Sequence, residues 1–121
     1  MQRSKPKSTN RVAKMNSLIQ QVLSVAIREF LEGEPGLVTV SKVETSGDLK
    51  WAKVWISIVG GNDDSIFNVL NRNIYDIQGE LNDNLDTKMF PRISFHLDTA
   101  PRYAQHIDEL IKHVHEEDEQ K

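Results

Sequence analysis

The strictest pattern in the chain is an alternation of apolar and polar side chains between residues 51 and 58. The even-numbered positions are small or aliphatic, whereas the odd-numbered positions include Trp51, Lys53 and Trp55. A period of two predicts a β-strand with one buried face. We therefore predict two strands, at about 37–45 and 49–59, which are joined by a turn at Ser46-Gly47-Asp48.

Two longer segments have the spacing of amphipathic helices. Between residues 12 and 30, apolar side chains recur at gaps of three or four. Cap candidates at 8–10 precede this helix, which we expect to begin after Asn10 and to end before Gly33 and Pro35. Residues 66–85 repeat the pattern, but Gly79 and the run 82–84 are poor helix formers. We therefore predict a bend or two shorter helices in this second segment.

The remaining periodic segments complete the predicted fold. A third strand is expected at 92–98, after Pro91, and a terminal amphipathic helix at 103–114. The order is then α-β-β-α-α-β followed by a helix. Because helices connect the second strand to the third, these two strands can pair in parallel. The predicted fold class is α+β, with a three-stranded mixed sheet that helices cover on one face.

Length and composition predict one small folded domain. The chain has 121 residues, of which 38% are hydrophobic, and it contains no cysteine. The lack of cysteine excludes disulfides and thiolate metal sites and fits a reducing compartment. No apolar run has the length of a membrane span, and no apolar segment follows the basic N-terminus as in a secretory signal. We expect a cytoplasmic protein that does not contact membranes.

Charge is distributed unevenly, although the formal net charge is only −3. Residues 1–28 contain six lysines and arginines and no acidic residue, whereas the end of the chain, from Glu116, is mostly acidic. Cations that continue into a helix can be presented rigidly, which favours a functional role for the basic N-terminal part. The acidic end is interpreted as a solvated tail.

Short motifs spread over the chain carry a family resemblance. They are, in order, Arg11-Val12-Ala13, Gly36-Leu37-Val38-Thr39-Val40-Ser41, Val43-Glu44, Asp48-Leu49, Ala52-Lys53-Val54, Leu70-Asn71, Ile93-Ser94-Phe95 and Ile107-Asp108-Glu109-Leu110. No motif is specific alone. Their order and spacing over about residues 9–111 resemble the ribosome-binding factor A family of small-subunit assembly factors.

The resemblance implies a type II KH-like domain at 9–98, between a flexible basic arm at 1–8 and a C-terminal helix with an acidic tail at 99–121. It implies binding of the 30S subunit through 16S rRNA, late in assembly and rRNA processing, without catalysis, cofactor or small-molecule substrate. We expect a monomer. KH domains bind nucleic acid with a GxxG loop between two helices, which this family replaces with an Ala-x-Gly kink. The aligned residues, Asn73-Ile74-Tyr75, contain neither alanine nor glycine.

Cations on rigid surfaces are the expected RNA contacts, because phosphates supply most of the affinity in nucleic-acid binding. The candidate RNA-binding residues are Arg3, Lys5, Lys7, Arg11, Lys14, Arg72, Asn73, Lys88 and Arg92. Trp51 and Trp55, with Lys53 between them, can stack on unpaired bases. They can equally seat the apolar stripe of the terminal helix. This second interpretation is favoured, because that stripe otherwise lacks a partner.

Two other function classes compete with RNA binding. Histidines at 106, 113 and 115 could serve a metal site, but their spacing matches no metal-binding signature. The chain also lacks a cysteine or a glycine-flanked serine that would suggest a nucleophile. We therefore predict neither a metal site nor an enzyme. The alternative function is a KH-like protein-interaction module that binds an acidic protein partner.

Overall fold

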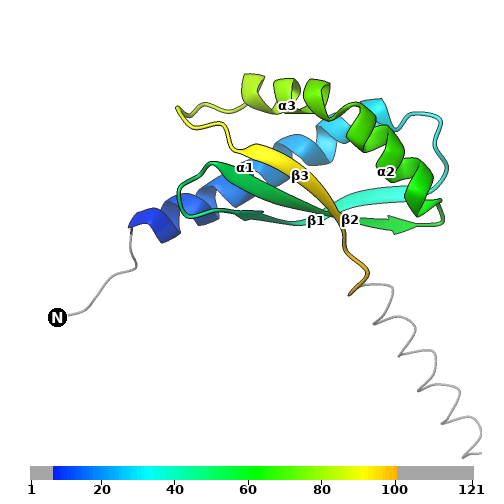
Figure 1. Ribbon diagram of the computed structural model, residues 1–121, viewed down its shortest axis with the longest axis horizontal. Coiled ribbons are helices and arrows are strands. Elements are labelled where there is room, and N and C mark those ends of the chain that lie inside the picture. Colours follow the sequence, from blue (N-terminus) through cyan, green and yellow to red (C-terminus); the bar gives the residue numbers. More distant parts are fainter. Residues whose placement is uncertain (1–6, 101–121) are drawn as a thin grey trace, which may run out of the picture.

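The computed structural model describes residues 7–100, which form helices and strands in the predicted order (Figure 1). They are α1 (Lys7–Phe30), β1 (Leu37–Thr45), β2 (Trp51–Val59), α2 (Asp63–Arg72), α3 (Ile74–Asp83) and β3 (Arg92–Leu97). This α-β-β-α-α-β order is that of the predicted type II KH-like domain. The terminal helix predicted at 103–114, the candidates Arg3 and Lys5, and the histidines at 106, 113 and 115 lie outside the described residues.

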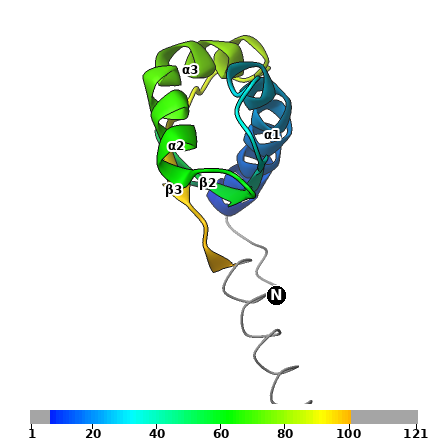
Figure 2. The ribbon, with the colours of Figure 1, turned by 90° about the vertical axis from the view of Figure 1, so that its right-hand side faces the viewer.

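The strands form one mixed sheet in the order β1-β2-β3. The central strand, β2, is antiparallel to β1 and parallel to β3. The prediction of a mixed sheet, with parallel pairing across the helical crossover, is confirmed. The helices α1, α2 and α3 lie on one face of this sheet (Figure 2). Within residues 7–100, no helix covers the opposite face.

The core lies between the sheet and the helices. The even-numbered side chains of β2, from Ala52 to Ile58, are at most 2% exposed, as the alternation predicts. The sequence pattern places Val22 and Phe30 on the apolar stripe of α1. Both side chains are only half-buried, and they pack against the border of the core. The helical side chains of the core are Met15, Ile19, Leu23, Ile27, Ile66, Leu70, Ile77 and Leu81.

Two elements begin at residues other than those predicted. α1 begins at Lys7, ahead of the expected caps, so Lys7 and Ser8 are helical. β2 begins at Trp51 instead of about residue 49, because Leu49 has a left-handed backbone, with φ of 60°, that a strand does not contain. The Leu49 side chain is buried, and its burial offsets the strain of a conformation that is rare for a bulky residue.

Polar side chains of α1 attach the helix to β1. The amide oxygen of Asn16 accepts a hydrogen bond from the backbone N–H of Thr45 at 2.8 Å. The Nε2 group of Gln20 donates to the carbonyl of Val40 at 3.0 Å. The β1–β2 register shifts between Val40 and Lys42, so Gln20 provides a partner where the ladder is irregular. These bonds fix the position of α1 along the hairpin.

The predicted bend falls at Asn73, between α2 and α3. Asn73 has φ of −105° and ψ of 12°, outside the helical region but not left-handed. Its Nδ2 group donates to the Val69 carbonyl at 2.8 Å, and its carbonyl accepts from the N–H of Ile77 at 2.9 Å. Asn73 thus ends one helix and begins the next without alanine or glycine. The prediction of two shorter helices is confirmed, and Gly79 lies inside α3.

Glycine has no conformational role at position 79. A Cβ atom built on Gly79 meets no heavy atom within 4 Å outside the surrounding helix backbone, and its φ is not positive. Alanine restricts the unfolded chain more than glycine does. We expect Gly79→Ala to raise the free energy of unfolding by about 0.5–1 kcal/mol. Urea unfolding followed by circular dichroism measures this change, and a loss of stability would contradict the prediction.

Gly36 is the contrasting position. Its φ is 104°, and a Cβ atom there would lie 2.7 Å from the Cα of Gly61, where the segment before β1 passes the segment after β2. Both the backbone conformation and the close approach exclude a side chain. We expect Gly36→Ala to lower the free energy of unfolding by more than about 1 kcal/mol in the same urea experiment. An unchanged free energy of unfolding would contradict the prediction, because it would show that the segments before β1 and after β2 can move apart without loss of stability.

Candidate nucleic-acid interface

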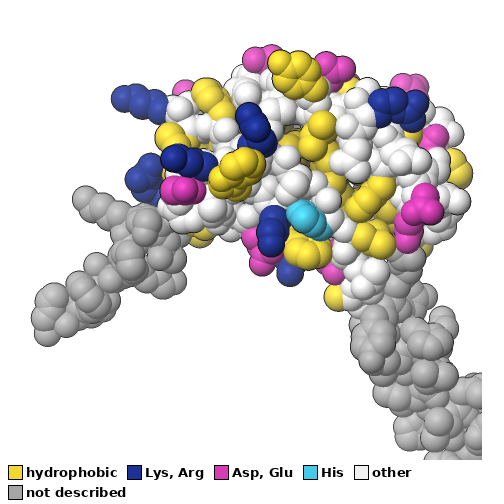
Figure 3. All heavy atoms as spheres, viewed as in Figure 1, with side chains coloured by type: hydrophobic (Ala, Val, Ile, Leu, Met, Phe, Trp, Pro, Cys, Tyr) yellow, Lys and Arg dark blue, Asp and Glu magenta, His cyan; other side chains and the backbone are white. Residues whose placement is uncertain are grey.

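Three segments meet at one end of the fold: the start of α1, the β1–β2 turn, and the loop between α3 and β3 (Figure 1). Two adjoining pockets lie there and share Leu49 and Met89 in their walls. Figure 3 shows lysine and arginine side chains among hydrophobic ones at this end, on the left of the view. We call this surface the basic end, and it consists of Arg11, Lys14, Leu49, Lys50, Trp51, Lys88, Met89, Phe90 and Arg92.

The fold gathers several predicted RNA-binding residues at the basic end. Arg11, Lys14 and Lys88 line the first pocket, and Arg92 lines the second. Arg11 and Lys14 share a face of α1 because they are three residues apart. Lys88 and Arg92 reach the same region from the loop before β3 and from the first residue of that strand. Residues from distant parts of the sequence thus form one positively charged surface.

The first pocket has an apolar floor and a charged rim. Met15 and Leu49 are buried in its walls, whereas Arg11, Lys14 and Lys88 are exposed. Its volume is about 180 Å³. Small-molecule sites typically measure about 300–1,000 Å³. This pocket is therefore smaller than a typical small-molecule site, and three cations surround it.

The second pocket is lined by aromatic rings that solvent reaches. Trp51 is 57% exposed and Phe90 is 47% exposed. Arg92 is the register partner of Trp51 in the parallel pair of β2 and β3, and its guanidinium carbon lies 5.7 Å from the Trp51 ring centroid. This distance is typical of a cation–π contact. Lys50 adds a second cation to the pocket, which measures about 310 Å³.

Hydrogen bonds of Ser46 and Asp48 fix the turn that carries Lys50 and Trp51. The Ser46 hydroxyl donates to Oδ1 of Asp48 at 2.6 Å and accepts from the N–H groups of Lys50 and Trp51. Oδ1 of Asp48 also accepts from the N–H of Lys50 at 3.1 Å. The bond from Ser46, followed by that from the Lys50 backbone, lowers the pKa of Asp48. The turn is therefore held by an ionised carboxylate.

Gln78 of α3 anchors the loop that carries Lys88 and Phe90. Its Nε2 group donates to the Pro91 carbonyl, and its Oε1 atom accepts from the N–H of Ile93, both at 3.0 Å. The N–H of Arg92 donates to the Lys50 carbonyl at 2.9 Å. The end of the loop is thus bonded on one side to α3 and on the other to the turn before β2. This arrangement fixes Phe90 and Arg92 beside Trp51.

The second tryptophan of the alternating strand has other partners. Trp55 donates from Nε1 to Oε1 of Glu44 at 2.7 Å. Its ring lies 5.0 Å from Nζ of Lys42 and 5.1 Å from the His96 ring centroid. Trp55 is half-buried among these neighbours, whereas most of Trp51 is exposed. The helix predicted to cover both lies outside the described residues, so that interpretation stays a prediction.

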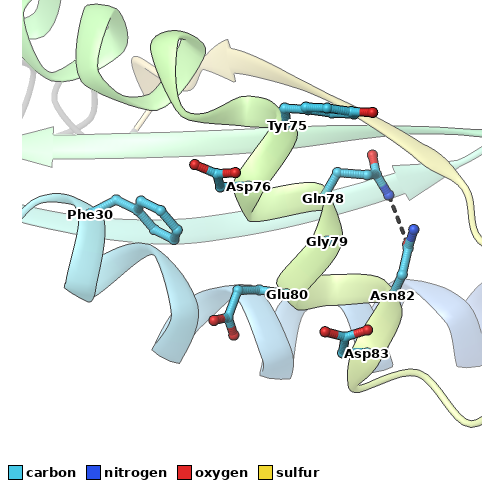
Figure 4. Close-up of a pocket in the computed structure, with 8 residues that line it drawn as sticks. All are labelled: Phe30, Tyr75, Asp76, Gln78, Gly79, Glu80, Asn82 and Asp83. Atoms are coloured by element: carbon cyan, nitrogen blue, oxygen red, sulfur yellow. Dashed lines mark hydrogen bonds between the residues drawn. The ribbon is translucent and has the colours of Figure 1, made fainter.

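The candidates Arg72 and Asn73 lie apart from the basic end, at the junction of α2 and α3. The pocket that begins there is lined by Tyr75 and by carboxylates of α3, and it shares no residue with the two pockets of the basic end. Figure 4 shows Asp76 and Glu80 extending toward the side of α3 on which Phe30 of α1 lies. Carboxylates repel phosphates, so this surface disfavours RNA.

Sequence reasoning did not single out Lys50 and Phe90. Lys50 is one of several isolated lysines, and only its place next to Trp51 suggests a role. Phe90 stands before Pro91, where the chain is expected to be extended, and an aromatic residue outside any apolar periodicity is a signal that could have identified it. Lys7, another candidate, is the first residue of α1.

The described part of the chain contains neither a candidate metal cluster nor a candidate membrane-spanning helix. Within residues 7–100, no group of three or more histidine, cysteine, aspartate or glutamate side chains could hold a metal ion. No helix in that range is both long enough and apolar enough to cross a membrane. The cations and exposed rings of the basic end therefore remain the most distinctive chemistry in the described structure.

The fold resembles solved structures of known proteins. It is similar to the crystal structure of ribosome-binding factor A from Thermus thermophilus, with a TM-score of 0.63 and 19% identity over 71% of this chain and 94% of that chain. It is also similar to the solution structure of a putative ribosome binding factor A from Thermotoga maritima, with a TM-score of 0.59 and 29% identity over 78% and 91% of the two chains.

A third similar structure is a homology model of Thermus thermophilus ribosome binding factor A fitted into a cryo-EM map of the complex of that factor with 30S. Its TM-score is 0.61, with 19% identity over 69% of this chain and 91% of that chain. At 19% identity, the two Thermus structures establish likeness of fold alone. They confirm the predicted α+β architecture.

Curated relatives give the sequence counterpart of this likeness. Ribosome-binding factor A of Acinetobacter baylyi is 32% identical over 115 residues, which cover 86% of each chain. The Clostridioides difficile protein of that name is 30% identical over 115 residues, or 93% of this chain and 91% of its own. The family model described as Ribosome-binding factor A matches residues 11–111. The chain belongs to the ribosome-binding factor A family.

Proposed function

We propose that this protein binds the 30S ribosomal subunit through 16S rRNA during late subunit assembly and rRNA processing, without catalysing a reaction. Family membership supports the ribosomal partner, and one similar structure is described as part of a 30S complex. The observation that carries the RNA-binding role is the basic end. There Arg11, Lys14 and Lys88 surround one pocket, and Arg92 lines an adjoining pocket that contains exposed aromatic rings.

Local charge supports RNA binding although the net charge is −3. Five cations belong to the basic end, whereas Asp48 and Asp86 are the acidic residues within the turn and loop segments that form it. Acidic side chains line the pocket on α3 instead. A molecule charged in this way is attracted to a phosphate lattice by one end and is oriented as it approaches. Because the cations are gathered at one end, that end can attract phosphates although the net charge of the chain is −3.

The chemistry of the basic end favours binding over catalysis. Its side chains are cationic, aliphatic or aromatic, and none of them is a nucleophile next to a general base. Thr87 also lines the first pocket, but its hydroxyl donates to the Met89 carbonyl at 2.7 Å and serves the loop. Such a surface can hold phosphates and bases but has no group placed for proton transfer.

The salt dependence of binding tests the role of the basic end. Removing one phosphate contact lowers the slope of log affinity against log salt by about 0.7–0.9. We expect Arg11→Gln to reduce the slope for 30S subunits by that amount, and Arg11→Gln with Lys14→Gln to reduce it by about twice as much. Binding is measured by co-sedimentation at a series of KCl concentrations.

Arg28→Gln is the matched control, because it makes the same change on the same helix. Arg28 lines a pocket at the opposite end of α1, roughly 25 Å from Arg11 at the rise of 1.5 Å per residue. We expect its slope to match that of the unaltered protein. Equal effects of both substitutions would show that overall charge, not the basic end, drives binding. A slope near zero for the unaltered protein would indicate a protein partner and contradict rRNA binding.

The distribution of the full-length protein among ribosomal particles tests the assembly role. We expect a tagged protein to co-migrate with free 30S subunits in a sucrose gradient of cell lysate and to be depleted from 70S particles. An assembly factor must leave before the subunits join, which is the reason for this distribution. Detection after gradient fractionation at low and high salt provides the measurement. A protein that stays at the top of the gradient at low salt would contradict the proposal.

A further inference from the structure

We propose that the second pocket of the basic end binds unpaired bases of a single-stranded RNA segment, which stack on Trp51 and Phe90. This inference rests on the proposed function and specifies its RNA class. Both rings line one pocket of about 310 Å³ that also contains Lys50 and Arg92. Bases and phosphates of the same strand can therefore be bound side by side.

The solvent exposure of the Trp51 and Phe90 rings supports this proposal. Trp51 and Phe90 are each about half exposed, and they lie in the same pocket although they come from β2 and from the loop before β3. Adjoining exposed rings with a cationic rim are typical of an interaction site, whereas a single exposed apolar side chain is not. Stacking on a base covers an aromatic face without a specific hydrogen-bond pattern.

The comparison with Trp55 is the second argument. Trp55 stands on the same face of β2, but its indole N–H is bonded to Glu44 and its ring lies beside Lys42 and His96. Among residues 7–100, Trp51 has one such neighbour, Arg92, which lies over its ring. The two tryptophans therefore have different roles: Trp55 is part of a cross-strand cluster, and Trp51 is available to a ligand.

The position of the cations is the third argument, and it selects RNA as the occupant. The aromatic pocket shares Leu49 and Met89 with the pocket that Arg11, Lys14 and Lys88 surround. A strand whose base stacks on Trp51 can place neighbouring phosphates against these cations. An apolar protein segment would gain from the rings but would leave the cations without a counterpart.

The class of RNA follows from which bases the Trp51 and Phe90 rings can contact. In an A-form duplex, the bases are stacked on each other, and the major groove is too deep and narrow for side chains to read. Unpaired bases in loops, bulges and strand ends can instead be splayed out onto aromatic side chains. The aromatic pocket therefore favours a single strand, with little preference for base identity.

The experiment uses Trp51 as its own reporter. The chain contains two tryptophans, so the Trp55→Phe variant of the full-length protein leaves Trp51 as the sole indole. A ten-nucleotide RNA of mixed sequence is titrated in, either as a single strand or annealed to its complement. We expect the single strand to quench Trp51 emission and the duplex to quench it several-fold less at equal occupancy, which is measured by RNA anisotropy.

Variants of the two rings give the affinity readout. We expect Trp51→Ala and Phe90→Ala each to lower single-strand affinity by about 5- to 100-fold, whereas Trp51→Phe keeps most of it. Trp55→Phe is the matched control and is expected to bind as the unaltered protein does. Circular dichroism verifies folding. If Trp51→Ala does not fold, the quenching of Trp51 in the Trp55→Phe variant still decides the question.

Several outcomes would contradict base stacking on Trp51 but would not contradict the proposed binding to 30S subunits. Equal quenching by single strand and duplex, or binding that leaves Trp51 emission unchanged, would show that bases do not stack there. A shift of Trp51 emission with protein concentration alone would assign the rings to contacts between copies of the chain. Failure of the unaltered protein to co-sediment with 30S subunits would instead contradict the proposed function itself.

Discussion

The rest of the structure depends on the burial of one face of the central strand. β2 pairs with β1 on one side and β3 on the other, and its even-numbered side chains are covered by the helices. Because successive side chains of a strand point to opposite faces, this burial forces Trp51, Lys53 and Trp55 onto the face that no helix of residues 7–100 covers. The alternation that builds the core therefore also places both tryptophans on the opposite face of the strand.

Position along β2 then separates the two tryptophans. Trp55 lies inside the strand, where the register gives it Lys42 on β1 and His96 on β3 as neighbours. Trp51 is the first residue of the strand, beside Arg92 on β3, while its carbonyl accepts from the N–H of Ser46 in the turn. Ser46, in the turn, leaves the Trp51 ring uncovered on the side of β1. Strand ends thus provide exposed rings because one neighbour is missing.

The sequence predicts what is periodic and misses what depends on contacts between segments. Alternation and helical spacing identify the element order, the mixed sheet and the buried residues of β2. The left-handed Leu49 delays the start of β2, and only its burial against the core makes that conformation tolerable. Cations of α1 are visible in sequence as a cluster, but their meeting with Lys50 and Phe90 requires the turn and the loop to be placed by Ser46 and Gln78.

Charge placement limits how such a protein can bind RNA. Acidic residues of α3 line one pocket, and the cations of the basic end line two others. The acidic pocket shares no residue with either pocket of the basic end. In the proposed function, phosphates are attracted to one surface and repelled by the other, which disfavours wrapping of RNA around the domain. In the proposed function, a one-sided contact of few phosphates yields a modest affinity with a shallow salt dependence. Reversible binding would suit the proposed assembly role, because such a factor must leave the subunit. The proposed stacking on Trp51 and Phe90 would add affinity that salt does not screen.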